Sequence, residues 1–457
     1  MQAGDFVLGP TYEEMARPEL IPDDIRQLAV SALGADELNP VNLFNIHWKD
    51  SSNRVRYLVF PRQVTALDVN IIVLLGSGFP SGSHKVGPAY AMMAEACVDG
   101  LIDPQVHTIL APSTGNFGIG AAYVCSLMGF RSLVIMPDSM SRERYERIRR
   151  YGGNLELTPG TESDVILTLQ RTQELMRNPS NHVLAQFESF SNYRFHRHVT
   201  GRAAVEAARG VGNGRIACFV SAPGSAGTLA AGDHVKSVFP DAHVVAVEPY
   251  ECSTLSTGGK GQHRVEGIGD KMCTLIHNVL TTDFVAVVHD EDAVRALKVI
   301  RDGTSVLEEL GVGHEEAVAL RDQLGVSGMF NIIAAARMAR WLRLGPNENV
   351  VTVATDGFDR YHSVIDDLDR RSLETTPNVL HRWIRDAFAG PEDRMVFDCR
   401  RKPAKERLFA QKQVDWVPLG WSVERLETLK RQEAWEAEYE KIGAYDEKIR
   451  AARGNAR

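Results

Sequence analysis

One lysine and two glycine-rich loops are the parts of this sequence most able to do chemistry. Lys85 ends the small-residue stretch Gly82-Ser83-His84-Lys85. A lysine amine forms an imine with an aldehyde, and it becomes available when burial and nearby positive dipoles favour its neutral form. The loops 113–118 and 224–228 each follow an apolar, strand-like run and precede a helix-like run. Backbone N–H groups at such helix starts can bind an anion, so the chain offers one amine nucleophile and two anion-binding loops.

The two loops differ in what they can bind. Gly224-Ser225-Ala226-Gly227-Thr228 lies between a strand predicted to end near Ser221 and a helix predicted to begin near Leu229. Its small side chains let successive amides converge on a phosphate. Ser113-Thr114-Gly115-Asn116-Phe117-Gly118 can bind a carboxylate in the same way. The alternatives stay open: a tight turn for the first loop and a capped helix start for the second.

Two competing site types do not fit the spacing of the residues. Gly76 and Gly78 precede the lysine as in a nucleotide-binding loop, but that loop requires Gly-Lys followed by Ser or Thr, and here Val86 follows. His196 and His198 suggest a metal site. Residues two apart point in different directions on a helix, and no carboxylate pattern accompanies the pair. We therefore expect neither a nucleotide site nor a metal site.

Composition limits the partners and the compartment. The net charge of the 457 residues is -8, which argues against nucleic acid, because binding it needs clustered Lys and Arg. The six cysteines show no paired spacing, so we expect free thiols in a reducing compartment. Residues 1–10 lack the pattern of a signal peptide, and the longest apolar run, near 71–75, is too short to span a membrane. These features predict a cytoplasmic protein with no membrane partner.

The elements that position the three loops follow an α/β pattern. From about Val106 onward, short β-branched runs alternate with helix-like stretches, which predicts open, mostly parallel sheets with helices on both faces. Ligands bind beyond the carboxyl ends of the strands in such a fold, where all three loops fall. Residues 141–151 are predicted to form a helix with Ser141 as N-cap and Gly152 just after its end. The predicted strands are 108–111, 132–136, 155–157, 182–185, 217–221, 243–248 and 350–354.

The same pattern suggests how the chain divides. We expect a large cofactor-binding α/β domain made of residues 51–131 and 187–369, with a smaller, mobile α/β domain at 132–186 between its two parts. Residues 1–50 form an N-terminal extension. Residues 370–457 are charged and poor in strand-like runs, and 423–450 read as helix. We expect this C-terminal extension to be helical and to pack on the core or on a second subunit.

Taken together, the loops resemble those of the fold type II pyridoxal phosphate family. This family includes cysteine synthase, cystathionine beta-synthase, threonine synthase and the tryptophan synthase beta subunit. Gly82-Ser83-His84-Lys85 looks like the lysine motif of the last of these, and residues 113–118 look like the substrate-carboxylate loop of cysteine synthases. Residues 224–228 take the place of the phosphate-binding loop, and Gln186 maps onto a glutamine that contacts the substrate carboxylate.

Later pieces of the sequence keep the order of the family's motifs. Val247-Glu248-Pro249 is followed by Glu266-Gly267-Ile268-Gly269 and then by Gly325-Val326-Ser327-Gly328. Thr355-Asp356-Gly357-Phe358-Asp359-Arg360-Tyr361 resembles the segment whose hydroxyl meets the cofactor ring nitrogen. The resemblance covers about residues 78–363. It implies two α/β domains like those of the tryptophan synthase beta subunit.

The resemblance also implies a role for each motif residue. Lys85 holds pyridoxal 5'-phosphate as a Schiff base and acts as the catalytic base, and His84 either touches the phosphate or only packs. Asn116 meets the cofactor hydroxyl, and either Thr355 or Asp356 faces the ring nitrogen. The phosphate is held by Gly224, Ser225, Ala226, Gly227 and Thr228, and the substrate by Ser113, Thr114, Gly115, Asn116, Phe117 and Gln186.

The implied activity is that of a cysteine synthase-like lyase or transferase. It is β-elimination or β-replacement on a small β-substituted L-amino acid through an aminoacrylate intermediate, by a homodimer. Ser113 stands where tryptophan synthase has the glutamate that manages indole, which argues against tryptophan synthesis. Val86-Gly87-Pro88 follow the lysine where dehydratases and threonine synthases commonly have Arg-Gly or Asp-Arg-Gly. The alternatives are a serine or threonine deaminase and a non-catalytic protein that binds an amino acid or the cofactor.

Overall fold

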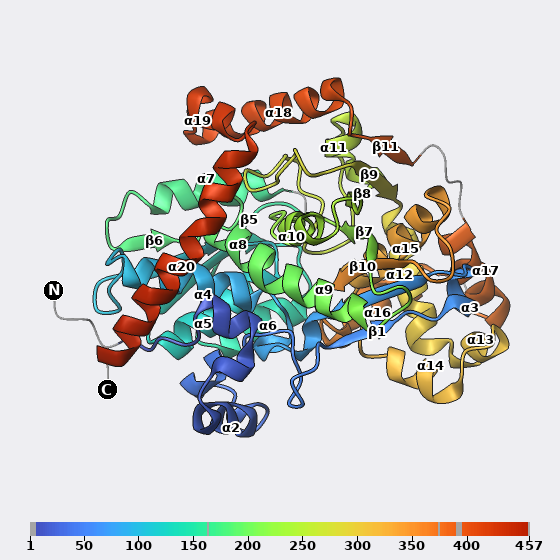
Figure 1. Cartoon of the computed structure of the whole chain (residues 1–457), viewed down its shortest axis with the longest axis horizontal. Coiled ribbons are helices and arrows are strands. Elements are labelled where there is room, and N and C mark those ends of the chain that lie inside the picture. The colour runs from blue at the N-terminus through green and yellow to red at the C-terminus, as the bar shows by residue number, and fades with distance from the viewer. Residues whose placement is uncertain (1–5, 162–163, 373–374, 390–394, 456–457) are drawn as a thin grey trace.

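Two β-sheets with helices packed around them make up most of the chain (Figure 1). The computed structural model describes residues 6–161, 164–372, 375–389 and 395–455. Over these residues the sheets hold seven and four strands. The arrangement confirms the predicted α/β class with open, mostly parallel sheets.

The larger sheet has parallel inner strands and one antiparallel strand at each edge. In spatial order its strands are β1 (Tyr57–Val59), β2 (Asn70–Leu75), β10 (Asn349–Ala354), β7 (Ile216–Ser221), β8 (His243–Pro249), β9 (Phe284–Val288) and β11 (Val396–Asp398). The inner strands are almost wholly buried apolar runs. Such runs are typical of strands with helices on both faces.

The smaller sheet is parallel throughout. Its order is β5 (Asn154–Thr158), β4 (Arg131–Pro137), β3 (Thr108–Pro112) and β6 (Asn181–Val183). With these, all seven predicted strands are present, and their ends lie within two residues of the prediction.

Strand β3 belongs to the smaller sheet, although the sequence places residues 51–131 in the larger unit. Thr108 of β3 pairs with Arg131 of β4 on one side and with Asn181 of β6 on the other. The apolar pattern of a buried strand does not specify which strand lies beside it, because pairing depends on the register with distant segments. The domain division itself stays a prediction.

The helices account for most of the remaining described residues. Residues 141–151 form the predicted helix, with Ser141 at the N-cap and Gly152 at a φ of +77° after its end. The α-helices are α1 (Tyr12–Ala16), α2 (Asp23–Ala32), α3 (Arg62–Thr65), α4 (Val86–Val98), α5 (Asn116–Met128), α6 (Arg142–Arg150), α7 (Val165–Leu175), α8 (Phe190–Phe195), α9 (Gly201–Arg209), α10 (Ala230–Val238), α11 (Thr254–Thr257), α12 (Asp290–Asp302), α13 (Thr304–Glu309), α14 (His314–Leu320), α15 (Val326–Trp341), α16 (His362–Arg371), α17 (Pro377–Ala389), α18 (Lys402–Trp416), α19 (Val423–Thr428) and α20 (Gln432–Asn455).

Helices cover both faces of the larger sheet. Alternate residues of a strand point to opposite faces, so Ile72 and Val351 pack with α9, whereas Ile71 and Val350 pack with α15. The first of these cores also contains the apolar side chains of α4 and α5 and those of the smaller sheet. A single core therefore joins the two sheets on that side.

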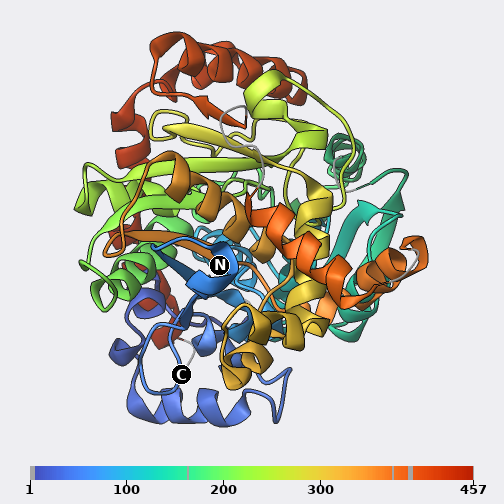
Figure 2. The same cartoon turned by 90° about the vertical axis from the view of Figure 1, so that its right-hand side faces the viewer.

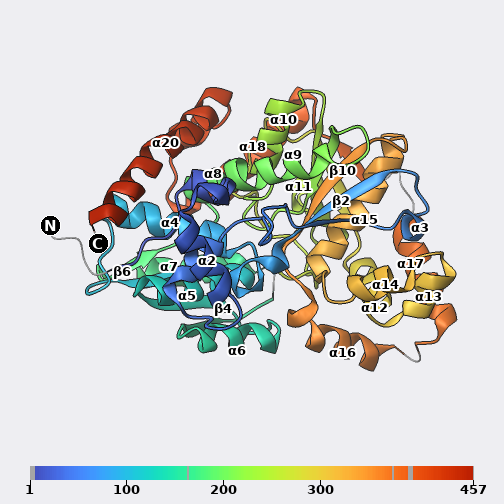
Figure 3. The same ribbon diagram turned by 60° about the horizontal axis from the view of Figure 1, so that its bottom comes forward.

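The C-terminal region is helical, as predicted, but the stretch 423–450 is not one helix. It contains α19 and most of α20, with a turn between them. Helix α20 runs along one side of the molecule beside α4 and α8, as Figures 1 and 3 show. In Figure 2, the red helices α18 and α19 lie above one edge of the larger sheet. The extension thus packs on the core of its own chain.

Within the described ranges, every helix is too short or too polar to cross a membrane. Over the same residues, His, Cys, Asp and Glu side chains nowhere gather in a group of three or more that could hold a metal ion.

Candidate active site

The loop that carries Lys85 is anchored on the segment after β10. Ser83 forms an antiparallel bridge with Asp356, and the His84 N–H donates to the Thr355 carbonyl at 3.3 Å. The buried Arg360 donates to the Gly82 carbonyl at 3.0 Å. These contacts fix Lys85 at the start of α4, beyond the carboxyl end of β2.

The loop after β3 is shaped by its serine and by a buried arginine. The Ser113 hydroxyl accepts the N–H groups of Gly115 at 3.0 Å and of Gly118 at 2.9 Å. A Cβ at Gly115 would lie only 1.5 Å from Nη1 of Arg144, which reaches in from α6. Only glycine fits at this position while Arg144 stays in place.

The loop between β7 and α10 is equally restricted. Ala226 has a φ of +65°, a left-handed conformation that is costly for a residue with a Cβ. A Cβ at Gly227 would lie 2.3 Å from Oδ1 of Asn192, and one at Gly224 would lie 2.4 Å from the Gly267 carbonyl. Asn192 also donates to the Ser225 hydroxyl at 2.9 Å. Small residues let this backbone turn tightly beside its neighbours.

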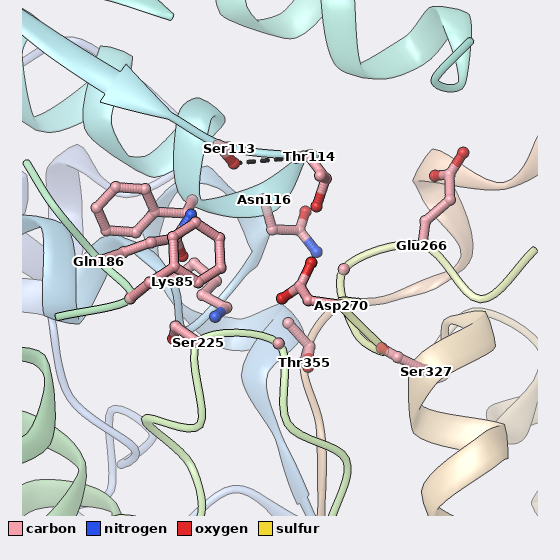
Figure 4. Close-up of a pocket in the computed structure, with 15 residues that line it drawn as sticks. Lys85, Ser113, Thr114, Asn116, Gln186, Ser225, Glu266, Asp270, Ser327 and Thr355 are labelled. Atoms are coloured by element: carbon pink, nitrogen blue, oxygen red, sulfur yellow. Dashed lines mark hydrogen bonds between the residues drawn. The ribbon is translucent and has the colours of Figure 1, made fainter. Parts of the chain in front are cut away.

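These loops meet around one cavity (Figure 4). The predicted residues that line it are Lys85, Ser113, Thr114, Gly115, Asn116, Phe117, Gln186, Gly224, Ser225 and Thr355. The predicted residues that do not line it are His84, Ala226, Gly227, Thr228 and Asp356. The sequence reasoning assigned no site role to five further lining residues, Phe187, Glu266, Gly267, Asp270 and Ser327. Three of these five residues, Glu266, Gly267 and Ser327, lie in the motifs 266–269 and 325–328. The order of these motifs along the chain was the sequence signal that could have identified them as site residues.

Asp356 is buried beside the cavity, and two side chains engage it. Asn116 donates to its Oδ2 at 2.5 Å, and the Tyr361 hydroxyl donates to the same oxygen at 2.9 Å. Burial raises the pKa of this carboxyl. Its neighbour Thr355 lines the cavity instead. Thr355 and Asp356, which the sequence left as alternatives, therefore differ: Thr355 faces the cavity, and Asp356 is bound by Asn116 and Tyr361 beside it.

His84 lies behind the lysine among aromatic rings. Its ring centroid is 5.6 Å from that of Trp48 and 5.1 Å from that of His196. It is fully buried, and across the described ranges neither of its ring nitrogens has a hydrogen-bond partner. Burial, and then the nearby charge of Lys85, lower the pKa of His84 well below its usual value. The imidazole is therefore neutral and has one N–H group to offer to an acceptor.

Two carboxylates face the cavity from the loop after residue 265. Glu266 pairs with Arg144 at 2.6 Å and accepts the Ser141 N–H at 3.1 Å, so it joins this loop to α6. The Asp270 side chain points into the same space as Lys85 (Figure 4). Burial raises the pKa of Asp270 to about 7, although the charge of Lys85 opposes the rise. A carboxyl with this pKa can both give and take a proton near neutrality.

The sequence of this chain is similar to those of known proteins. The sequence model of a family described as "Pyridoxal-phosphate dependent enzyme" matches residues 58–356. Cysteine synthase B of Campylobacter jejuni is 31% identical over 285 residues, which are 62% of this chain and 87% of that protein.

Solved structures are also similar to this chain. A hydrogen sulfide-producing enzyme of Fusobacterium nucleatum, solved with an α-aminoacrylate intermediate, gives a TM-score of 0.57 at 27% identity over 69% of this chain and 88% of that one. O-acetyl serine sulfhydrylase isoform 3 of Entamoeba histolytica gives a TM-score of 0.58 at 26% identity over 73% of this chain and 92% of that one. The matched region contains all the loops around the cavity.

Proposed function

Because the chain belongs to the pyridoxal-phosphate dependent enzyme family, we propose that it catalyses β-elimination or β-replacement on a small β-substituted L-amino acid, in the manner of a cysteine synthase. The observation that carries the proposal is one cavity that brings together the Lys85 amine, the Asp270 carboxyl and two loops rich in backbone N–H groups. This combination supplies an amine nucleophile, a second acid–base group and sites for two anions.

The residues around the cavity fit pyridoxal 5'-phosphate. Lys85 would hold the aldehyde carbon, and the amides of residues 224–228 would hold the phosphate. Oδ1 of Asn116 and both ring nitrogens of His84 are buried polar atoms without partners among the described residues, and such atoms call for a ligand. Asn116 would bind the cofactor hydroxyl and His84 the phosphate. We assign the ring nitrogen to Thr355, since Thr355 lines the cavity, whereas Asp356 does not line it and Oδ2 of Asp356 is already bound by Asn116 and Tyr361.

The chain's own residues account for the remaining steps. When bound, the cofactor withdraws electrons from the Cα of the amino acid. The amides of residues 113–117 and the Gln186 side chain orient the substrate carboxylate. Lys85, freed when the substrate amine takes its place on the aldehyde carbon, would then remove the Cα proton as general base. Asp270 gives a proton to the departing group at Cβ, or takes one from an incoming nucleophile.

Asp270 also narrows the substrate class. A hydroxyl or thiol group leaves Cβ readily only with a proton, which a carboxyl across the cavity can supply. A phosphate ester would bring further negative charge toward Asp270, which like-charge repulsion disfavours once this carboxyl is ionised. We therefore propose serine, cysteine or O-acetylserine as substrates ahead of O-phosphoserine.

Titration with amino acids tests the proposed function. We expect the visible absorbance of the cofactor-loaded protein to change with serine, cysteine or O-acetylserine. Pyruvate should appear when no nucleophile is present, and a new β-substituted amino acid when a thiol is added. Absorbance and product analysis by mass spectrometry are the measurements. If the loaded protein binds amino acids but never forms product, it is a binding protein and the proposal fails.

The phosphate-binding loop gives a separate prediction. Gly227→Val should weaken binding of pyridoxal 5'-phosphate about 10- to 100-fold, because the new side chain would collide with Asn192 and His196 and displace the loop. Absorbance titration of the apoprotein gives the affinity. Gly443→Val is the matched control, since nothing lies within 4 Å of a Cβ there. Equal affinities for the two variants would contradict the assignment of the loop.

We also propose a cytoplasmic homodimer. Leu20, Leu28, Val30 and Leu33 lie on and beside α2 and are exposed, which supports a surface that a second copy covers. All six cysteine side chains are free and buried, which supports a reducing compartment. Sedimentation of the wild type and of Leu28→Glu would test the first point.

A further inference from the structure

Helix α18 lies outside the matched family region and contacts a segment that leads directly out of the cavity wall. The family match ends at residue 356, whereas α18 spans Lys402–Trp416. The segment that it contacts, residues 273–282, begins three residues after Asp270. Over the described residues, this segment has no α-helix or strand, so its shape depends on what binds its backbone.

Two lysines on one side of α18 bind the carbonyls of this segment. Nζ of Lys412 donates to the carbonyls of Leu275 at 2.9 Å and His277 at 2.6 Å. Lys405 lies seven positions earlier, on the same side of the helix. Its Nζ donates to the carbonyls of Val279, Leu280 and Thr282 at 2.6–3.0 Å. Five backbone carbonyls of the segment thus depend on two side chains of α18.

The end of α18 holds the start of the segment. Asp415 accepts the Cys273 N–H at 2.7 Å, and Nε1 of Trp416 donates to the Cys273 carbonyl at 2.9 Å. Both backbone groups of Cys273 are therefore satisfied by α18. The chain cannot shift at this residue without breaking one of these bonds.

Lys412 is buried to a degree that is rare for a lysine. Its residue exposure is 1%, and its amine lies 5.6 Å from the centre of the Trp435 ring of α20. Burial of an amine is costly unless hydrogen bonds compensate for the lost water. The two carbonyls of the segment supply those bonds, so the helix and the segment stabilise each other.

The segment in turn supports two walls of the cavity. The Leu275 N–H donates to the carbonyl of Phe187, which lines the cavity, at 3.0 Å. Thr274 and His277 line a second, smaller cavity together with Asp270. Asp270 and Gly224 border both cavities, so the second lies directly behind the first. A shift of the segment would therefore reach both Phe187 and Asp270.

We infer that α18 is a positioning element of the active site: Lys412, Asp415 and Trp416 hold residues 273–277, and through them Asp270 and Phe187, in the cavity wall. The inference rests on the proposed function, which makes this cavity the substrate site. The matched family region, residues 58–356, does not include α18.

Lys412→Met tests the inference in the full-length, cofactor-loaded protein. Methionine fills a similar volume but donates to neither carbonyl. We expect faster hydrogen exchange at the amides of residues 267–282 and at Phe187, with cofactor absorbance and stoichiometry unchanged. We also expect kcat/KM to fall about 10- to 100-fold, mainly through a higher KM, because the wall no longer holds its geometry. Lys402→Met is the control on the same helix, where the side chain is 87% exposed.

Several outcomes separate the possibilities. If exchange rises only at residues 275–282 while KM is unchanged, the segment does not position the wall and the inference is overturned. A general loss of stability with unchanged KM would also overturn the inference, since it would show that Lys412 stabilises the fold without positioning the cavity wall. Should Lys412→Met fail to fold, Trp416→Phe removes one donor while keeping an aromatic ring and is read in the same way. If the wild type turns over no substrate, the proposed function fails, but the exchange at 267–272 still tests the support of the wall.

Discussion

Lys85→Ala should lower kcat at least about 10⁴-fold, because the substitution removes both the amine that binds the cofactor and the base that takes the Cα proton. The cofactor should still bind without a covalent link, since the loop 224–228 and His84 are intact. Borohydride reduction followed by peptide mass spectrometry should find the cofactor on Lys85 in the wild type and on no lysine in the variant. Absorbance titration should give the residual cofactor affinity.

Lys298→Ala is the matched control for that experiment. Lys298 is buried, but it pairs with Asp302 and Asp369 and does not line the cavity. Its variant should keep turnover and the covalent link at Lys85. Turnover of Lys85→Ala within tenfold of the wild type, or a label on another lysine, would show that the catalytic amine is elsewhere.

Asp270→Asn should separate substrates by their leaving group. With serine, kcat should fall about 10²- to 10³-fold because the hydroxide leaves without a proton donor. With O-acetylserine the loss should stay below about tenfold, since acetate leaves as an anion and needs no such acid. Steady-state rates of pyruvate formation from the two substrates give the comparison.

The pH dependence follows from the raised pKa of Asp270, which is about 7. The acid form exists below this value, so the wild-type rate with serine should fall as pH rises through about 7. The Asp270→Asn variant should not show this fall.

The stability of the protein should depend on the same group, because the ionised form of Asp270 is unfavourable in the buried site. The contribution of the protonated carboxyl to stability is full below the unfolded pKa and is lost as pH rises through about 7. Above pH 7 the variant should therefore be more stable than the wild type in urea.

Asp290→Asn controls for the removal of a buried carboxylate. Burial raises the pKa of Asp290 as well, but this residue is not in the cavity wall. The Asp290→Asn variant should leave the ratio of the rates of pyruvate formation from serine and from O-acetylserine unchanged. Equal losses with serine and O-acetylserine for Asp270→Asn would mean that this residue shapes the cavity and does not act as the acid.

Local sequence patterns by themselves determined seven of the eleven described strands and the chemistry-bearing loops, but not β1, β2, β9 and β11. The seven predicted strands are present because buried parallel strands are short apolar runs whatever their neighbours are. Helix α6 begins and ends where Ser141 and Gly152 indicate. Gly152 adopts the left-handed conformation of a helix C-terminus, whereas the Ser141 hydroxyl donates to Glu266 and does not cap the first turn. Lys85 and residues 113–117 each lie beyond the carboxyl end of a parallel strand, as this fold predicts, but the two strands belong to different sheets, so the packing of the sheets brings the loops to one cavity.

Only the tertiary structure decided which side chains complete the site. Asn116 and Asp356 meet across 240 positions of the chain, and this contact distinguishes Asp356 from Thr355. Asp270 and Phe187 join the wall through a segment that α18 holds, and the charged pattern of the C-terminal extension could not specify that partner. Likewise, β3 belongs to the smaller sheet because it pairs with β4 and β6, which its own sequence does not specify. Burial, pKa and pairing depend on atoms that lie close in space but far apart in sequence, so a local pattern cannot specify them.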